Sequence, residues 1–170
     1  MSRAAALLYS IGLIGLLLAT PALAEEKATA DEIVTKVKEA AAYIAKEGDK
    51  AIAEFQDIKS AWAWKDTYIF VLKCSEQTAA AHMASPKMVG ADQSGLADKR
   101  GNYFFLQFCD VAEANPEKGG WVEYWWPKKD QTEPSRKVSY VLQVPGQPFQ
   151  VGAGVYSDDA TADQLNARLK

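Results

Sequence analysis

The segment Gly119-Gly-Trp-Val-Glu-Tyr-Trp-Trp-Pro127 has the composition of a β-strand and carries the densest group of aromatic residues in the chain. Successive side chains of a strand point to opposite faces. Two sets result: Trp121, Glu123 and Trp125 on one face, and Val122, Tyr124 and Trp126 on the other. These rings could fill a core. Because indole and phenol rings also carry hydrogen-bonding groups, they equally suit the wall of a pocket for a small polar ligand.

Two further strands are predicted after this segment, at residues 136–144 and 149–156. The connections Pro127–Ser135 and Pro145–Pro148 are short and rich in turn-forming residues. Connections of this length favour an antiparallel meander. Upstream, residues 67–73 are rich in β-branched and aromatic residues and are predicted to be another strand, followed by a turn and an extended segment that leads to His82.

Helices are predicted on both sides of that first strand. Thr29-x-x-Glu32 is a capping-box signature, and apolar residues recur behind it at helical spacing as far as Gly48. A shorter helix from Asp49 would complete a helical arm over residues 30–59. Residues 102–114 predict a short helix with Phe104, Phe108 and Val111 as its buried edge. This order of elements predicts an α+β fold with the helices at the ends of an antiparallel sheet.

The first 24 residues have the three parts of a secretory signal peptide. Arg3 gives a positive start, an apolar run extends from Ala4 to Ala19, and small residues precede a predicted cleavage point after Ala24. An uncleaved membrane anchor is the alternative. No later segment is apolar for long enough to cross a membrane. We therefore expect residues 25–170 to form one domain that is periplasmic or secreted.

Composition narrows the possible functions of that domain. The chain has 170 residues, 48% of them hydrophobic, which fits one globular domain rather than a disordered chain. A net charge of −3 without a Lys/Arg cluster argues against nucleic acid as a partner. With one histidine, no Gly-x-Ser-x-Gly motif and no glycine-rich phosphate loop, an enzyme is the least favoured function, and neither a cofactor nor a metal site is expected.

Cys74 and Cys109 are the two cysteines of the chain. In an exported protein an even pair can form a disulfide, whereas in the cytosol two such residues would be small buried thiols. Both are expected at the ends of amphipathic elements, which favours the disulfide. The bridge would close a loop of some 35 residues and stabilise the fold by roughly 3–4 kcal/mol. Neither cysteine lies in a Cys-x-x-Cys motif, which argues against redox catalysis.

Several polar residues and glycines are candidates for a binding site. No metal-ligating residue flanks His82, which either satisfies a loop backbone or donates a hydrogen bond to a ligand. Arg136 and Lys137 begin a predicted strand near an aromatic hydroxyl, and a carboxylate ligand needs such a combination of cation and donor. A solvated strand end is the alternative. Gly152 and Gly154 share a strand face and would leave a floor open to a ligand or another backbone.

Taken together, these segments resemble the single Cache domain of the second subtype, an extracytoplasmic PAS-like sensor module. The resemblance covers nearly all of the predicted mature chain, including the long N-terminal helix. Its landmarks are Tyr68-Ile-Phe-Val71, His82, Met88-Val-Gly90, the segment 119–127, Lys137-Val-Ser-Tyr-Val141, and Val151-Gly-Ala-Gly-Val-Tyr156 followed by Asp158-Asp159.

The resemblance implies a long helix along a curved antiparallel sheet, with a ligand cavity between the other face of the sheet, a short helix and loops. Members of this group bind small molecules, often short organic acids such as pyruvate, acetate or propionate, and most are the outer parts of chemoreceptors and kinases. Here Lys73-Cys-Ser-Glu76 replaces the usual Asp-x-Asp-Gly turn, and Cys109 falls in the short helix. One disulfide could therefore pin the altered hairpin to that helix.

We accordingly expect a binding and sensing module for a short organic acid that lacks its own output domain. The predicted ligand-binding residues are His82, Tyr103, Tyr124, Trp126, Arg136, Lys137 and Tyr140. Lys137 would neutralise the ligand, while Tyr140 and His82 would donate hydrogen bonds. The alternative is a protein-interaction module, in which the aromatic surface docks on an exported part of a membrane-bound sensor or transporter and side chains fill the pocket.

Overall fold

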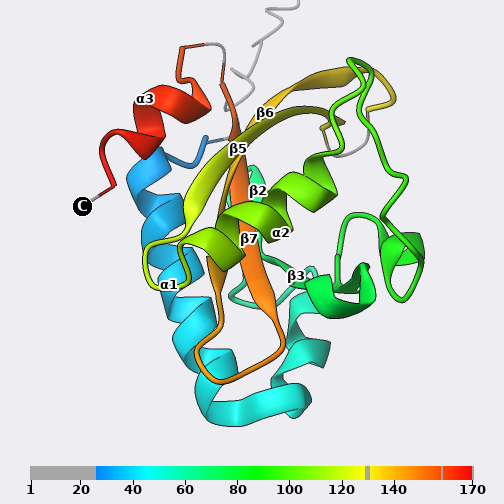
Figure 1. Cartoon of the computed structure of the whole chain (residues 1–170), viewed down its shortest axis with the longest axis vertical. Coiled ribbons are helices and arrows are strands. Elements are labelled where there is room, and N and C mark those ends of the chain that lie inside the picture. Colours follow the sequence, from blue (N-terminus) through cyan, green and yellow to red (C-terminus); the bar gives the residue numbers. More distant parts are fainter. Residues whose placement is uncertain (1–25, 129–130, 158, 170) are drawn as a thin grey trace, which may run out of the picture.

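A computed structural model describes residues 26–128, 131–157 and 159–169. Figure 1 shows the arrangement, with a long helix on one side of a twisted sheet and a shorter helix on the other. The predicted signal peptide, residues 1–24, lies outside the described residues. None of the helices in the described ranges is long and apolar enough to cross a membrane.

The long helix α1 (Ala30–Glu47) begins and ends where the sequence predicts. The side chain of Thr29 accepts a hydrogen bond from the Glu32 N–H, and the Glu32 carboxylate accepts one from the Thr29 N–H, which completes the capping box. Gly48 ends the helix with a φ of 68°, a conformation that favours glycine. The residues that follow, Gly48–Gln56, form the 3₁₀ helix η1, a tighter form than the predicted α-helix.

The strands form one hairpin and one sheet. Their bounds are β1 (Ala63–Trp64), β2 (Thr67–Tyr68), β3 (Phe70–Lys73), β4 (Thr78–Ala81), β5 (Gly120–Pro127), β6 (Pro134–Gln143) and β7 (Gln150–Tyr156). Strands β1 and β2 pair with each other, and the other five follow the order β4-β3-β7-β6-β5 with every pair antiparallel. The predicted meander of β5, β6 and β7 is confirmed.

The strand predicted over residues 67–73 is split at Ile69. The N–H of Ile69 donates to the carbonyl of Trp62, so this residue bonds outside the main sheet and divides β2 from β3. After β3, the short helix η2 (Cys74–Glu76) turns the chain back into β4. The predicted turn and second extended segment are therefore confirmed.

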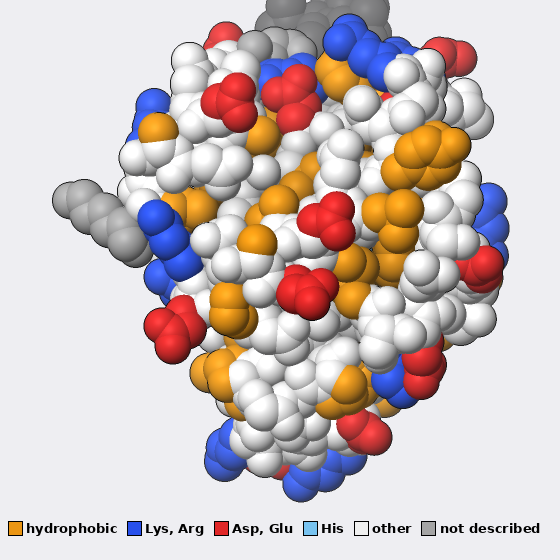
Figure 2. Space-filling model, in the orientation of Figure 1, with side chains coloured by type: hydrophobic (Ala, Val, Ile, Leu, Met, Phe, Trp, Pro, Cys, Tyr) orange, Lys and Arg blue, Asp and Glu red, His pale blue; other side chains and the backbone are white. Residues whose placement is uncertain are grey.

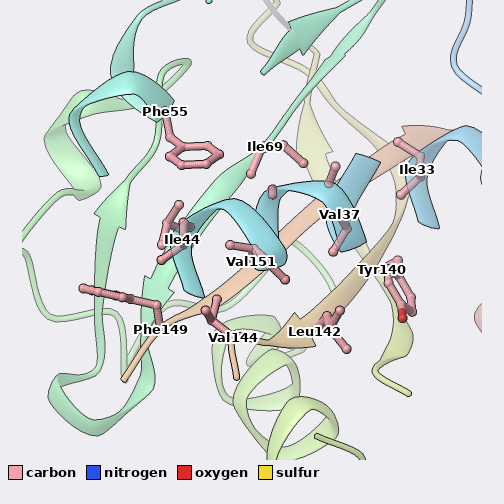
Figure 3. Packing of buried hydrophobic residues seen from close by; sticks show 14 of the residues in the cluster. Ile33, Val37, Ile44, Phe55, Ile69, Tyr140, Leu142, Val144, Phe149 and Val151 are labelled. Carbon is pink, nitrogen blue, oxygen red and sulfur yellow. The ribbon is translucent and has the colours of Figure 1, made fainter. Parts of the chain in front are cut away.

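Helix α1 covers one face of the sheet. Figure 3 shows Ile33, Val37 and Ile44 of α1 lying against Leu142 and Val151 of the sheet. All three helix side chains are fully buried. This layer is the larger core of the molecule, and burial of the apolar stripe of α1 supplies its stability.

Helix α2 (Phe104–Ala114) and η3 (Pro86–Met88) cover part of the opposite face. Phe104, Phe105 and Phe108 of α2 pack there against Phe70 and Leu72 of β3. Val111, predicted as part of the buried edge, is only partly buried at its margin. A short C-terminal helix, α3 (Ala162–Asn166), was not expected from the sequence and packs beside β5 (Figure 1).

Candidate functional site

The candidate site is built around one cross-strand row on the α2 face of the sheet. Lys137 on β6 is paired with Tyr124 on β5 and with Tyr156 on β7, so the three side chains stand side by side. Tyr68 from β2 closes over the same place, since both its ring and that of Tyr156 lie beside the Lys137 ammonium. A cation thus lies among three phenol rings.

Lys137 is 2% exposed, and its Nζ lies 5.0 Å from the ring centre of Tyr68 and 5.1 Å from that of Tyr156. Both distances are typical of cation–π interactions. No carboxylate in the described part of the chain lies within ion-pair distance of this ammonium. Burial lowers the pKa of Lys137 to about 8, because the charged form loses its solvation and the Asp66 carboxylate, which lies beyond ion-pair distance, offsets only part of that loss.

His82 lies at the other end of the site, 6% exposed, where it follows β4. Burial, together with the nearby Lys137 charge, lowers its pKa to about 4, so the ring is neutral at pH 7. Its Nδ1 accepts a hydrogen bond of 3.0 Å from the Ser85 N–H. In the neutral ring the proton is then on Nε2, which makes His82 a hydrogen-bond donor at that atom.

A small cavity of about 20 Å³ adjoins His82 between the sheet and α2. Apart from His82 and the ring of Tyr124 the lining is apolar or aromatic: Phe70, Leu72, Met88, Phe104, Phe105, Phe108 and Trp126. Tyr124 stacks on Phe104 with ring centres 4.6 Å apart, and Trp126 meets the same ring edge-on at 5.4 Å. In this form the cavity has room for about one water molecule.

The open space predicted beside Gly152 and Gly154 is occupied by the protein's own side chains. A Cβ at Gly154 would collide with Ser139 Oγ and lie 3.0 Å from Lys137 Cε. A Cβ at Gly152 would overlap the ring of Phe70. Gly154 thus leaves the space that lets Lys137 lie along the sheet, and Ser139 in turn hydrogen-bonds the Tyr124 hydroxyl at 3.0 Å.

Four of the seven predicted ligand-binding residues come together at this site: His82, Tyr124, Trp126 and Lys137. The other three lie elsewhere. Tyr103 is 52% exposed at the start of α2. Arg136 points to the opposite face of β6, where it donates to Glu123 and to the Ser157 carbonyl. Tyr140 also faces α1, beside Trp121, and its hydroxyl donates to the Lys118 carbonyl.

Two residues of the site, Tyr68 and Tyr156, were not among those predicted. Both lie in strands that the sequence did predict, and both fall within the landmark segments of the resemblance. The alternation of side chains along β7 could have indicated Tyr156, because it lies on the same strand face as Gly154 and Gly152, where a binding site was expected. Which face looked toward α2 was not visible in the sequence.

The predicted disulfide between Cys74 and Cys109 is confirmed, with a Cα–Cα separation of 5.6 Å. It joins η2, the turn between β3 and β4, to the middle of α2. The altered hairpin is therefore attached to the helix that carries Phe104, Phe105 and Phe108. The bridge ties the two walls of the cavity to each other.

A larger groove of about 430 Å³ lies on the outer side of Tyr68 and Tyr156. The other described residues that line it include Lys27, Trp64, Lys65, Asp66 and Lys128. The β1–β2 turn forms one wall and is tied to the start of α1, because Lys65 pairs with Glu32 and Asp66 accepts a hydrogen bond from the Ala28 N–H.

Comparison with known proteins identifies this architecture. The family model described as a Cache domain matches residues 27–161. A curated relative, the methyl-accepting chemotaxis protein McpP of Pseudomonas putida, is 37% identical over 82 residues. That match covers 48% of the present chain and 15% of the relative, so the chain spans a small part of that receptor's length.

Solved structures agree with the family. A periplasmic sensor domain of a chemotaxis protein is 26% identical, with a TM-score of 0.57 over 73% of this chain and 88% of that one. Two further structures share the fold. One is a Cache chemosensory domain described for carboxylic acid recognition, which is 23% identical, with a TM-score of 0.57 over 73% of this chain and 86% of that one. The other is a methyl-accepting chemotaxis protein from Vibrio parahaemolyticus, which is 19% identical, with a TM-score of 0.60 over 76% of this chain and 88% of that one. With a family model over most of its length, the chain belongs to the Cache domains, a family of sensor modules.

Proposed function

We propose that this Cache domain binds a short organic acid through Lys137. The observation that carries the proposal is a buried ammonium with no carboxylate partner in the described residues, held against two phenol rings. Burying an unpaired charge is costly, and a bound carboxylate would offset that cost. The structural neighbour described for carboxylic acid recognition adds support by analogy.

The surroundings of Lys137 favour a ligand with one anionic end and a short apolar remainder. The neutral His82, a donor at Nε2, and the hydroxyl of Tyr124 supply hydrogen-bonding groups near the charge. Beyond them the lining is aromatic and the cavity is small. Monocarboxylic acids of two to four carbons fit a site with one charged end and a small aromatic remainder. Dicarboxylates fit less well, since the described residues of the site include one cation only.

The same small cavity gives a second candidate function. A pocket filled by its own side chains is what a protein-interaction module would have, with docking on an exported part of a membrane sensor or transporter. Lys137 supports the first of these functions. A pocket that serves only as core has no use for a buried cation, and an apolar residue of similar volume would be more stable there.

The proposed location follows from the family and from the chain's N-terminal sequence. We place the domain in the periplasm or outside the cell, after cleavage behind Ala24. There it would meet small nutrients before they cross the inner membrane, and it would pass the bound state to a membrane-bound partner. Mass spectrometry of the protein recovered from the envelope tests the cleavage, because its N-terminus should be Glu25.

Calorimetric titration with acetate, propionate, pyruvate and butyrate tests the binding proposal. At least one acid should bind the wild type, and Lys137→Met should weaken that acid about a hundredfold or more, because the charge-assisted contact is lost. Removing a buried cation does not threaten the fold, so loss of binding in this variant is not loss of structure. Thermal unfolding of the same variant checks this point.

Lys118→Met is the matched control, because Lys118 is exposed at the end of the α2–β5 connection. Its affinity should equal that of the wild type. If no acid of this series binds the wild type, or if Lys137→Met binds as well as the wild type, the carboxylate proposal is refuted. Capture of an envelope protein by a domain that binds no acid would instead support the interaction module.

A further inference from the structure

The groove outside Tyr68 and Tyr156 has no part in the binding site as described, although it lies one ring away from it. Lys137 Nζ lies on the inner side of these rings, and Lys128 Nζ lies 5.6 Å from the ring centre of Tyr156. The groove is lined by Lys128 but not by Lys137, although both ammonium groups lie beside the Tyr156 ring.

We propose that this groove is the access route and an outer, weaker site for the carboxylate, and that Tyr68 is the gate between the two sites. The inference rests on the proposed function, since it concerns how an acid reaches Lys137. A ligand must have some route, because Lys137 is 2% exposed and the cavity beside His82 holds about one water. The groove has about 430 Å³, which is enough for a small acid with its hydration shell.

The charges of the groove suit an incoming anion. Three of the described residues that line it are lysines, namely Lys27, Lys65 and Lys128. Lys65 is already paired with Glu26 and Glu32, but neither Lys27 nor Lys128 has an ion-pair partner among the described residues. Among the described residues of the lining, the one carboxylate is Asp66, which accepts a hydrogen bond from the Ala28 N–H. An excess of cations at a groove mouth raises the local concentration of anions and their association rate.

The opposite side of the site is a poorer route. Figure 2, viewed as Figure 1, looks onto the face that carries α2 and shows hydrophobic side chains interspersed with acidic ones. Helix α2 exposes Asp110 and Glu113 and has no basic residue. An acid approaching there would meet like charges and then the packed rings of Phe104 and Phe108.

Tyr68 is better suited to move than Tyr156. The Tyr156 hydroxyl donates a hydrogen bond of 2.6 Å to the Pro127 carbonyl, which fixes that ring. The Tyr68 hydroxyl has no hydrogen bond in the described ranges, and its strand β2 has two residues paired only with the equally short β1 in that hairpin. A rotation of the Tyr68 side chain would open the path from the groove to Lys137 without breaking the sheet.

Stopped-flow measurement of association and dissociation rates, with the tightest acid found by titration, tests the route. Tyr68→Ala should raise the association rate about fivefold or more, even though loss of one cation–π contact weakens the equilibrium affinity. Lys128→Gln should lower the association rate about threefold, reduce its dependence on salt, and leave the dissociation rate within about twofold. Lys118→Gln, the matched surface control, should change neither rate.

Met88→Ala opens the α2 side of the cavity and separates the two possible routes. If Met88→Ala accelerates association while Tyr68→Ala does not, the access route is wrong but carboxylate binding stands. If Lys128→Gln and Lys118→Gln behave alike, the outer site is wrong. If the wild type binds no acid at equilibrium, the access route is refuted together with the proposed function.

Discussion

Lys137 is a costly residue in the ligand-free protein. Its ammonium is buried between tyrosine rings, and its lowered pKa shows that the charged form is less well solvated than in water. The cation–π contacts offset part of this cost. A carboxylate ligand would offset more, so binding and folding are linked through this one residue.

The pH dependence of stability should reveal this cost. A lysine whose pKa is lowered in the folded state destabilises that state below the folded pKa, and the penalty disappears as pH rises toward the unfolded value. Between pH 7 and 9.5 the unfolding free energy of the free protein should therefore rise by about 2 kcal/mol relative to that of Lys137→Met. Urea unfolding of both proteins measures the difference.

Ligand affinity should change in the opposite direction over the same range. Above pH 8 a growing share of the free protein has a neutral Lys137, so affinity for the acid should fall about tenfold per pH unit. Titration calorimetry at pH 7, 8, 9 and 10 follows the trend. Affinity that stays constant up to pH 10 would contradict a role for the Lys137 charge.

Secondary-structure elements were predictable from the sequence where they are long and periodic. The capping box and apolar spacing located α1, and alternation with turn residues located β5, β6 and β7. Strand β1, with it the pairing of β2 into a separate hairpin, and the helix α3 were missed, because a two-residue strand and a five-residue helix are too short for a period to show.

The sequence indicated which kinds of residue form the site, but not which face of the sheet each side chain occupies. Parity along a strand places Lys137 and Tyr140 on opposite faces, so both could not have lined one pocket, although the sequence alone does not say which face is covered by α2. The sequence singled out Lys137 because a cation beside aromatic donors is unusual. Tyr68 was missed because it reaches the site from the separate hairpin.

At the level of elements, the disulfide is expected to stabilise the contact between the β3–β4 turn and α2. The double variant Cys74→Ser, Cys109→Ser should lose roughly 3–4 kcal/mol of unfolding free energy in denaturant titrations, because its unfolded chain is less constrained. Wild-type protein reduced with dithiothreitol should match the double variant. A loss below about 1 kcal/mol would show that the packing of Phe105 and Phe108 alone holds α2 in place.

Across the whole molecule, each end of the described chain is tied by hydrogen bonds to another part of the fold. The start of α1 is tied to the β1–β2 turn, and the C-terminal segment covers the outer edge of the sheet. There the Asn166 side chain accepts from the Trp121 N–H and donates to the Trp121 carbonyl. Asp98 accepts the N–H of Trp125 on the same edge. Protected edges of this kind prevent pairing between sheets of different molecules.

Asn166→Ala should expose part of this edge. Two hydrogen bonds to a strand backbone would be lost, which should lower the unfolding free energy by about 1–2 kcal/mol. The variant should also self-associate more than the wild type at high concentration, as sedimentation velocity would show. Asn115→Ala is the control, because Asn115 is exposed at the end of α2 and its side chain makes no hydrogen bond among the described residues. Equal sedimentation of the two variants and the wild type would contradict a sealing role for Asn166.

Trp126 gives the protein an optical reporter of its own. Its indole borders the cavity, with the ring centre 6.3 Å from that of His82 and 5.4 Å from that of Phe104. The emission wavelength of an indole shifts when the polarity of its surroundings changes, so a ligand in the cavity should shift the emission maximum of Trp126. With Trp62, Trp64, Trp121 and Trp125 replaced by phenylalanine, the remaining signal would come from the binding site alone.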